Sequence, residues 1–276
     1  MKNKIILKKQ DLTSLSWSHI RSSSGTAGTF LKATKKSNGK KIYYKLSNYS
    51  DFEGITGHEC VNEIIVDRLL NILGVEHLSY SLIHADVNID GNIYDTYISA
   101  SEDFKKEHEN KIALDKFYSL EKNEKENPLE FCIRMGFGPF IYEMMAVDFI
   151  ICNRDRHGAN IEVLRNSKEK TMRLAPLFDH GMSLLFSCSD ESSIASFDIL
   201  ADKPVQCFTG TRSLYKNLEL IPKDSLRLFN PLKLTDKDYI LKDLDGIITP
   251  THQDKIFKMI YERYNYYENF CNQRRK

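Results

Sequence analysis

The chain has 276 residues and carries 39 lysines and arginines against 38 aspartates and glutamates, a formal net charge of +1. This length allows a large core, either in one two-lobed unit or in two domains. The balanced charge gives no overall basic field for nucleic acid. We therefore expect any binding of anions to be local, and we predict no direct contact with nucleic acid.

Targeting signals and metal-binding cysteines are not evident. The N-terminus offers only a three-residue apolar run at residues 5–7, and no later apolar stretch nears the ~18 residues of a membrane span. We expect no signal peptide, no membrane contact and a cytoplasmic location. The six cysteines are scattered without a C-x-x-C pair, which argues against a zinc site or a disulfide framework.

The first predicted elements are strands and hairpins over residues 13–48, interrupted by a serine- and glycine-rich loop. The small residues of this loop would let backbone N–H groups approach a phosphate closely. The loop lacks both the Gly-Lys-Ser ending of a Walker A motif and the G-x-G-x-x-G pattern, so its position in the chain matters more than its composition. The candidate nucleotide-binding residues here are Ser24, Gly25, Thr26, Ala27 and Gly28.

A strand with a lysine and a helix with a glutamate follow this loop. Residues 41–47 predict a short strand containing Lys45, and residues 57–73 predict a helix containing Glu63, with apolar residues at helical spacing. In protein kinases a strand lysine binds the nucleotide phosphates and pairs with a helix glutamate, and Lys45 with Glu63 fits that order. Glu59, one turn earlier on the helix, is the competing partner.

The next predicted elements are a strand pair over residues 80–85 and 93–99, joined by an Asn/Asp/Gly turn. The end of this pair is expected to be a hinge between two lobes, where backbone groups near Ser99 and Ser101 would hydrogen-bond adenine. Residues 104–127 are strongly charged and predict solvated helix and loop.

Helices are predicted for most of the remaining chain. An apolar helix over residues 140–152 leads into a polar loop, and residues 161–164 and 172–174 predict a hairpin behind that loop. Residues 235–272 predict helices with a tyrosine-rich face, which we interpret as core rather than as a platform for stacking bases.

The polar loop places Asp155 five residues before Asn160, and the hairpin returns Asp179 toward it. In a phosphoryl-transfer site one aspartate faces the attacking hydroxyl, while an asparagine and a second aspartate hold the metal on the nucleotide phosphates. Magnesium keeps several waters, so two protein ligands plus phosphate oxygens are sufficient. A simple polar turn is the alternative, since Asn, Asp and Gly gather in loops for conformational reasons.

Together these motifs resemble the HipA-like serine/threonine kinases of bacterial toxin–antitoxin systems. The resemblance covers about residues 20–185 by motif and the later residues by helical character. The residues that carry it are Ser22-Ser23-Ser24-Gly25, Lys45, Asn62-Glu63, Asn153, Asp155, His157, Asn160, Leu174, Pro176, Phe178 and Asp179. The Asp155 loop is also similar to that of the phosphatidylinositol 3/4-kinases.

The resemblance implies an α+β fold with two protein-kinase-like lobes. The small β-rich lobe would cover residues 1–100, and the larger, mostly helical lobe would cover residues 101–276. It also implies a serine/threonine protein kinase that uses ATP and Mg²⁺. The implied substrate is a protein, either an aminoacyl-tRNA synthetase or another translation factor. The enzyme would be a growth-inhibiting toxin, and a small antitoxin protein would be its partner.

The same resemblance assigns roles to individual residues. Asp155 would be the catalytic aspartate, Lys45 the phosphate-binding lysine, and Asn160 and Asp179 the magnesium ligands. We group Lys45 and His157 with Asp155 as catalytic, and Glu63 with the nucleotide-binding residues. Such kinases autophosphorylate at serines in the phosphate loop, and the candidates here are Ser22, Ser23 and Ser24.

The chain also departs from the family pattern. Longer members have an N-terminal subdomain before the phosphate loop, so we expect this chain to be a compact member whose missing part is a separate small protein. Asn153 stands where protein kinases have the histidine of H-R-D, while His157 follows the aspartate. This exchange favours the HipA-like and lipid-kinase branch over ordinary protein kinases.

Other functions are open alternatives. A lipid or small-molecule kinase could use the same loop, but a lipid kinase would want a basic or apolar membrane-facing surface, and only residues 273–276 are obviously basic. An exported effector kinase is a further possibility. A pseudokinase is opposed by the joint retention of the kinase residues, which are Lys45, Glu63, Asp155, Asn160 and Asp179.

Overall fold

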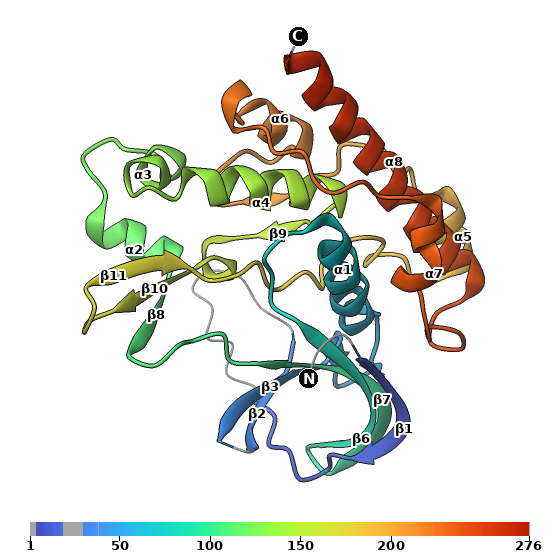
Figure 1. The fold of residues 1–276 in the computed structure, drawn as a ribbon. Coiled ribbons are helices and arrows are strands. Elements are labelled where there is room, and N and C mark those ends of the chain that lie inside the picture. Colours follow the sequence, from blue (N-terminus) through green and yellow to red (C-terminus); the bar gives the residue numbers. More distant parts are fainter. Residues whose placement is uncertain (1–3, 19–29, 38, 276) are drawn as a thin grey trace.

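The computed structural model describes residues 4–18, 30–37 and 39–275. Within them, the first part of the chain forms a five-stranded sheet in the order β1-β6-β7-β3-β2, and the later part is mostly helical (Figure 1). The strands of this sheet are β1 (Lys4–Asp11), β2 (Lys32–Ser37), β3 (Lys40–Lys45), β6 (Tyr80–Ile89) and β7 (Asn92–Glu102).

The predicted strands are present, with shifted ends. Strand β3 ends at Lys45 rather than at residue 47, and β6 and β7 form a longer hairpin than the sequence predicted. The tight turn between β6 and β7 is formed by Asp90 and Gly91, both of which have positive φ. Residues 13–18 do not form a strand, although Ser18 pairs with Lys32 at an isolated bridge.

Strand β1 was not predicted from the sequence. It runs parallel to β6 at one edge of the sheet, with Lys4 opposite Ser81 and Asp11 opposite Asp86. Five of its eight residues are lysine, glutamine or aspartate, and all eight are only partly buried or exposed. Because an edge strand has a neighbour on one side and little core to cover, it leaves no alternating pattern in the sequence.

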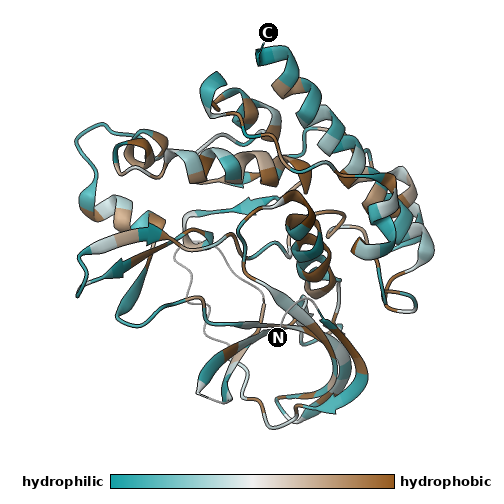
Figure 2. Ribbon diagram, in the orientation of Figure 1, coloured by the Kyte–Doolittle hydropathy of each residue, from teal (hydrophilic) through white to brown (hydrophobic). Residues whose placement is uncertain are grey.

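Helix α1 (Glu59–Leu73) lies between the sheet and the helical part (Figure 1). It begins two residues after the predicted position, because Gly57 has a φ of +82° that does not continue into a helix. It ends at Leu73, the predicted last residue, and the following Gly74 adopts the left-handed conformation. Nearly every α1 residue is buried, and Figure 2 shows apolar residues along this helix. The helix therefore contacts neighbours on all sides.

Helices are the main regular structure after residue 113. The α-helices are α2 (Leu114–Glu121), α3 (Pro128–Arg134), α4 (Gly138–Ile150), α5 (Glu191–Ser196), α6 (Leu214–Glu219), α7 (Lys237–Ile240) and α8 (Pro250–Arg275). Short 3₁₀ helices are η1 (Gly158–Asn160), η2 (Lys223–Ser225) and η3 (Leu234–Asp236). Helix α4 matches the predicted apolar helix and is buried along most of its length.

Residues 104–127 differ from the prediction of solvated helix and loop, because a strand lies within them. Strand β8 (Glu109–Ala113) pairs with β10 (Glu162–Asn166), which pairs in turn with β11 (Thr171–Leu174). The predicted hairpin is thus the β10–β11 pair, with β8 added at its edge. Two smaller pairs are β4 (Tyr49–Ser50) with β5 (Gly54–Ile55), and β9 (Asp155–Arg156) with β12 (Gln206–Cys207).

The tyrosine-rich face of α8 is largely core. Tyr264 and Tyr267 are each 1% exposed, whereas Tyr266 is 40% exposed. Tyr261 and Phe270 are partly buried and pack against the large core cluster. These rings pack in the core and are therefore not free to stack on bases. This agrees with the interpretation of the tyrosine-rich face as core.

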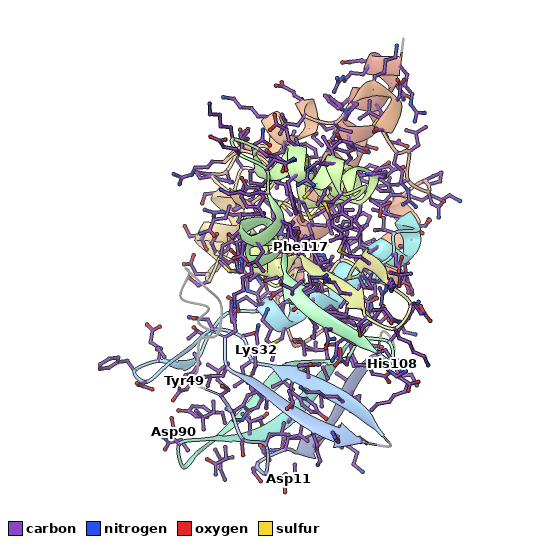
Figure 3. The ribbon with its side chains drawn as sticks, turned by 90° about the vertical axis from the view of Figure 1, so that its left-hand side faces the viewer. Asp11, Lys32, Tyr49, Asp90, His108 and Phe117 are labelled. Atoms are coloured by element: carbon purple, nitrogen blue, oxygen red, sulfur yellow. The ribbon has the colours of Figure 1, made fainter. Side chains whose placement is uncertain are left out.

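Buried apolar residues form two clusters. One lies within the sheet, and the larger one joins α1 to the helical part. In Figure 3, Asp11, Tyr49 and Asp90 lie in the β-rich part, while Phe117 lies among the helices. The expected boundary near residue 100 falls close to the end of β7, yet α1, which precedes it in sequence, packs into the larger cluster.

His58, the residue before α1, is buried against His252 of α8, with ring centroids 4.3 Å apart. Burial and, to a smaller extent, the adjacent His252 together lower the pKa of His58 to about 3, although a hydrogen bond with the Leu185 backbone acts in the opposite direction. The imidazole is therefore neutral in the folded protein at physiological pH.

This burial predicts a pH-dependent stability. Unfolded His58 titrates near 6.5, so between pH 6.5 and about 3 the unfolded chain binds one more proton than the folded chain. Stability should fall as the pH drops through this window, by about 1.4 kcal/mol per pH unit from this group. In urea unfolding at pH 6 and pH 5, His58→Asn should reduce the pH slope by that amount.

Ser47→Ala is the matched control for this prediction. It removes the hydrogen bond that the Ser47 hydroxyl accepts from the Cys60 N–H in the first turn of α1, without removing a titrating group. It should lower stability by the same amount at both pH values. An unchanged pH slope in His58→Asn would contradict the account.

Candidate active site

Lys45, Glu63 and Asp179 meet where the sheet, α1 and the segment after β11 come together. The Lys45 ammonium lies 3.4 Å from Glu63 Oε1 and 2.5 Å from Asp179 Oδ1. Glu59, the competing partner, instead accepts a hydrogen bond from the Asn48 N–H at 3.2 Å. The structure thus brings Lys45 to Glu63 and not to Glu59.

These three side chains are largely shielded from solvent, with exposures of 12%, 1% and 19% for Lys45, Glu63 and Asp179. Burial alone would raise the pKa of Asp179, but the charges of Lys45 and Lys32 outweigh it and hold that pKa well below its usual range. Burial lowers the pKa of Lys45, and the carboxylates of Asp179 and Glu63 more than offset this. The lysine is therefore charged and the aspartate ionised at neutral pH.

The segment from Asp179 to Ser183 is held by α1. The Glu63 carboxylate accepts the His180 N–H at 2.9 Å, and the Asn62 amide donates to the carbonyls of Gly181 and Ser183. A Cβ at Gly181 would lie 3.1 Å from Glu59 Cβ, so a glycine suits this close approach. One turn of α1 therefore fixes both the lysine partner and the loop that carries Asp179.

Asp179 itself has a φ of +57°, an unusual conformation for a residue other than glycine. Its N–H donates to the hydroxyl of Tyr80, at 3.1 Å. The Tyr80 N–H donates in turn to the buried Asp67 carboxylate of α1 at 2.6 Å. Sequence reasoning missed Tyr80 and Asp67, because nothing in the local pattern shows that the backbone of Tyr80 and its hydroxyl connect Asp67 to Asp179.

Asp155, His157 and Asn160 lie in one short loop formed by β9 and η1. The Asn160 amide donates to the Asp155 carbonyl at 2.8 Å, which fixes the direction of the Asn160 side chain. The Ala159 N–H donates to His157 Nδ1, so in the neutral ring the proton is on Nε2, 3.6 Å from Asp155 Oδ2. Asp155 is thus flanked by two residues of its own loop.

The Asp155 carboxylate is partly buried. Burial raises its pKa above the usual range, His157 opposes this, and the negative charge of Asp179 raises it further. Asp179 is therefore close enough for its charge to act on Asp155, and Arg156 joins the two loops by donating to the carbonyls of Asn160 and Phe178. A carboxylate with a raised pKa is better suited to accept a proton than an ordinary one.

A buried ion pair organises this loop. Arg156 and Asp148, 1% and 4% exposed, form two hydrogen bonds of 2.9 and 2.8 Å between guanidinium and carboxylate. The same guanidinium donates to the carbonyls of Asn160 and Phe178, at 3.2 and 2.8 Å. Arg156 therefore ties α4, the Asp155 loop and the residue before Asp179 to one point.

Asn153 completes this network. Its amide donates to Asp148 Oδ1 at 2.8 Å, and its own oxygen accepts the Asp155 N–H at 3.1 Å. Asn153 thus positions Asp155 from the place where ordinary protein kinases have a histidine. Sequence reasoning did not single out Asp148, which is one of two carboxylates, with Glu143, inside an otherwise apolar helix.

Ser99 and Ser101 do not match their predicted role. Each lies inside the sheet, opposite β3 on one side and β6 on the other, and they are 2% and 8% exposed. Their backbone groups belong to the ladders on both sides, so they are not free to bind adenine. The segment that leaves β7 begins only at Asp103, whose N–H donates to the Lys41 carbonyl.

Other residues near Lys45 and its carboxylate partners were not predicted. The Phe30 ring lies over the Lys45 ammonium, 4.6 Å from centroid to nitrogen, and Lys32 of β2 is the register partner of Lys45 in β3. The Phe104 and Phe178 rings pack together at 5.5 Å, beside the Lys111 ammonium. The predicted loop residues Ser22, Ser23, Ser24, Gly25, Thr26, Ala27 and Gly28 lie outside the described residues.

The described part of the chain lacks both a metal-binding side-chain cluster and a membrane-spanning helix. Residues 4–18, 30–37 and 39–275 contain no group of three or more His, Cys, Asp or Glu side chains that could hold a metal by themselves. Within the same ranges, none of the helices has the length and apolar character needed to span a bilayer.

The sequence matches no family model and no curated protein. Solved structures do match. The chain is similar to the crystal structure of a Helicobacter pylori proinflammatory kinase, CtkA, with a TM-score of 0.63 and 16% sequence identity. The similarity covers 96% of this chain and 98% of that one. The two proteins therefore share one α+β fold, with an N-terminal sheet followed by a helical part.

The buried pair predicts a double-mutant result. Asp148→Leu leaves the Arg156 guanidinium buried without its carboxylate and should lower the free energy of unfolding by about 3–5 kcal/mol. Combining it with Arg156→Met should recover part of this loss, because no charge is then left unpaired. Urea unfolding of both single variants and the double variant would measure this. A double variant with the summed loss would contradict the pairing.

Proposed function

We propose that this protein is a kinase that transfers the γ-phosphoryl group of ATP to serine or threonine hydroxyls of a protein, with Mg²⁺ as its metal. The observation that carries the proposal is the meeting of Lys45 with both Glu63 and Asp179, next to the Asp155 loop. The order of these residues along the chain is that of kinases. The fold shared with CtkA, a kinase, supports the same conclusion.

The residues present suit a magnesium–nucleotide complex. Asp179 offers an ionised carboxylate and Asn160 an amide oxygen, and both are the oxygen donors that Mg²⁺ prefers. Because Mg²⁺ retains waters and phosphate oxygens as ligands, a cage made of protein side chains alone is not required. When bound, the metal would neutralise charge on the β- and γ-phosphates.

The chain's own residues then have distinct tasks. The substrate hydroxyl oxygen forms a bond to the γ-phosphorus, the bond from that phosphorus to the ADP oxygen breaks, and Asp155 takes the hydroxyl proton. Lys45 holds phosphate oxygens by charge and is itself oriented by Glu63. His157 contacts Asp155 and would help orient its carboxylate toward the hydroxyl.

We further propose that the enzyme is a HipA-like toxin kinase acting in the cytoplasm. The support is the set of sequence motifs, together with the Asn153 and His157 exchange around Asp155. Its substrate would be a translation protein, such as an aminoacyl-tRNA synthetase, and a small antitoxin would neutralise it. A lipid or small-molecule substrate is the alternative that the same experiment distinguishes.

Asp155→Asn should abolish most phosphoryl transfer. Removing a positioned general base costs about 10²–10⁴-fold in rate, whereas binding of ATP should change little. The measurement incubates the purified protein with labelled ATP and a cell extract, then identifies the labelled species. We expect label on one translation protein with the wild type and nearly none with Asp155→Asn.

Asp224→Asn is the control, because this exposed aspartate of η2 is absent from the proposed mechanism. It should label as the wild type does. Label confined to lipid would favour a lipid kinase. No label with the wild type, or equal label with Asp155→Asn, would exclude the proposed mechanism.

Autophosphorylation of the serine loop is a second expected outcome. A phosphate on Ser22, Ser23 or Ser24 would add a charge of about −1.5 to −2 where ATP phosphates are expected, so it should inactivate the enzyme. Mass spectrometry after incubation with ATP should find this loop modified in the wild type and unmodified in Asp155→Asn. A loop without phosphate in a fully active enzyme would end this regulatory idea.

A further inference from the structure

A large pocket lies outside the candidate active site. Its volume is about 910 Å³, and it is bordered by the loop before α1, by α5 and by the start of α8. Figure 1 shows α5 beside the lower end of α8. The volume lies within the range of about 300–1,000 Å³ that is usual for small-molecule sites. None of the residues assigned to phosphoryl transfer is among the described residues that line it.

Two buried histidines line this pocket and lack a full set of hydrogen-bond partners. His58 and His252 are 9% and 5% exposed, and Nε2 of each ring has no partner. The ring of His58 hydrogen-bonds the Leu185 backbone through its other nitrogen. Burial keeps this imidazole neutral, so only one ring nitrogen carries a proton. Because the other nitrogen donates to the Leu185 backbone, Nε2 is an acceptor without a donor. A buried polar atom without a partner is unusual and calls for an explanation.

The other lining side chains have a consistent chemistry. Asp190 and Glu191 contribute carboxylates, and Glu191 accepts a hydrogen bond from the Thr249 hydroxyl at 2.7 Å. The isoleucines Ile194, Ile247 and Ile248 supply apolar surface. Among the described lining residues there is neither lysine nor arginine. Acceptors and apolar carbon without a fixed positive charge suit a ligand that brings the charge and the donors itself.

We propose that this pocket binds a small organic amine, whose ammonium group donates to Glu191 and to the histidine pair while its apolar body packs against the isoleucines. A charged donor can satisfy both a carboxylate and a neutral imidazole, whereas an anion would face two carboxylates. An inorganic cation is a poorer occupant, because no suitable group of three metal ligands exists among the described residues.

The position of the pocket would let a bound amine influence the active site through α1. His58 immediately precedes α1, the helix whose Glu63 pairs with Lys45. An occupant that joins His58 to α5 and α8 would favour one position of α1, and a ligand that prefers one position shifts the population toward it. This regulatory consequence rests on the proposed kinase function, whereas the binding itself does not.

The experiment measures binding to the full chain by calorimetry and by NMR shifts, with 2-phenylethylamine as the probe. Phenylacetate and 2-phenylethanol, of similar size, are its anionic and neutral counterparts. We expect the amine to bind about fivefold more tightly than either, since Glu191 is exposed and a charge pair at an exposed carboxylate is worth up to roughly that factor. Glu191→Gln should weaken amine binding by a similar factor.

Two further variants make the outcome decisive. Glu219→Gln, at an exposed glutamate of α6, is the matched control and should bind as the wild type does. Ile247→Trp fills the pocket and should abolish binding even if Glu191→Gln fails to fold. Equal affinity for the amine and the acid, or amine binding unchanged by Ile247→Trp, would overturn the proposal, as would no binding at millimolar amine. None of these results depends on kinase activity.

Discussion

The buried pair of Asp148 and Arg156 is the interaction on which the site depends. Asp148 belongs to α4, and Arg156 belongs to the loop that follows this helix. The guanidinium also donates hydrogen bonds to two carbonyls, those of Asn160 and of Phe178, the residue before Asp179. Backbone carbonyls buried at a loop need donors, and one planar guanidinium supplies them in fixed directions. The pair is therefore better understood as a means of joining three segments than as a source of stability, because burying both charges offsets much of their attraction.

Helix α1 plays the complementary role from the other side. Two successive turns of α1 contact three different parts of the site. Asn62 donates to the loop after Asp179, and Glu63 pairs with Lys45. Asp67 accepts the N–H of Tyr80, whose hydroxyl accepts the Asp179 N–H. Each of these three side chains makes at least one hydrogen bond or ion pair, which offsets the cost of burying it, although the Asn62 side-chain oxygen has no partner. The consequence is that Asp179 and the loop after it are held by side chains of both the sheet and α1, and the left-handed backbone of Asp179 is fixed by these contacts rather than by its own preference.

The sequence was informative where chemistry is local. The five-residue spacing of Asp155 and Asn160, the hairpin that returns Asp179, and the strand and helix that carry Lys45 and Glu63 all follow from short patterns, and the structure places them together. Partners distant in sequence could not be predicted in this way. Nothing in the pattern around Tyr80 indicates that its hydroxyl meets Asp179, and Ser99 looked like a hinge residue because the sequence does not show that β3 and β6 occupy both of its sides. Strand β1 was missed because its edge position imposes little alternation.

The contacts of the last helix bear on how the protein is made. Arg263 of α8, with no exposed surface, donates to the Phe149 carbonyl at the end of α4 and to the carbonyls of Ile199 and Ala201, and Cys207 pairs with the loop residue Arg156. A ribosome has therefore to synthesise the chain beyond residue 263 before the end of α4 receives this support. Domains generally form as units as the chain emerges, N-terminal part first. The β-rich part can fold early, but the Asp155 loop gains its full set of neighbours only late in translation, so an incomplete chain would carry the polar residues of the site without their arrangement.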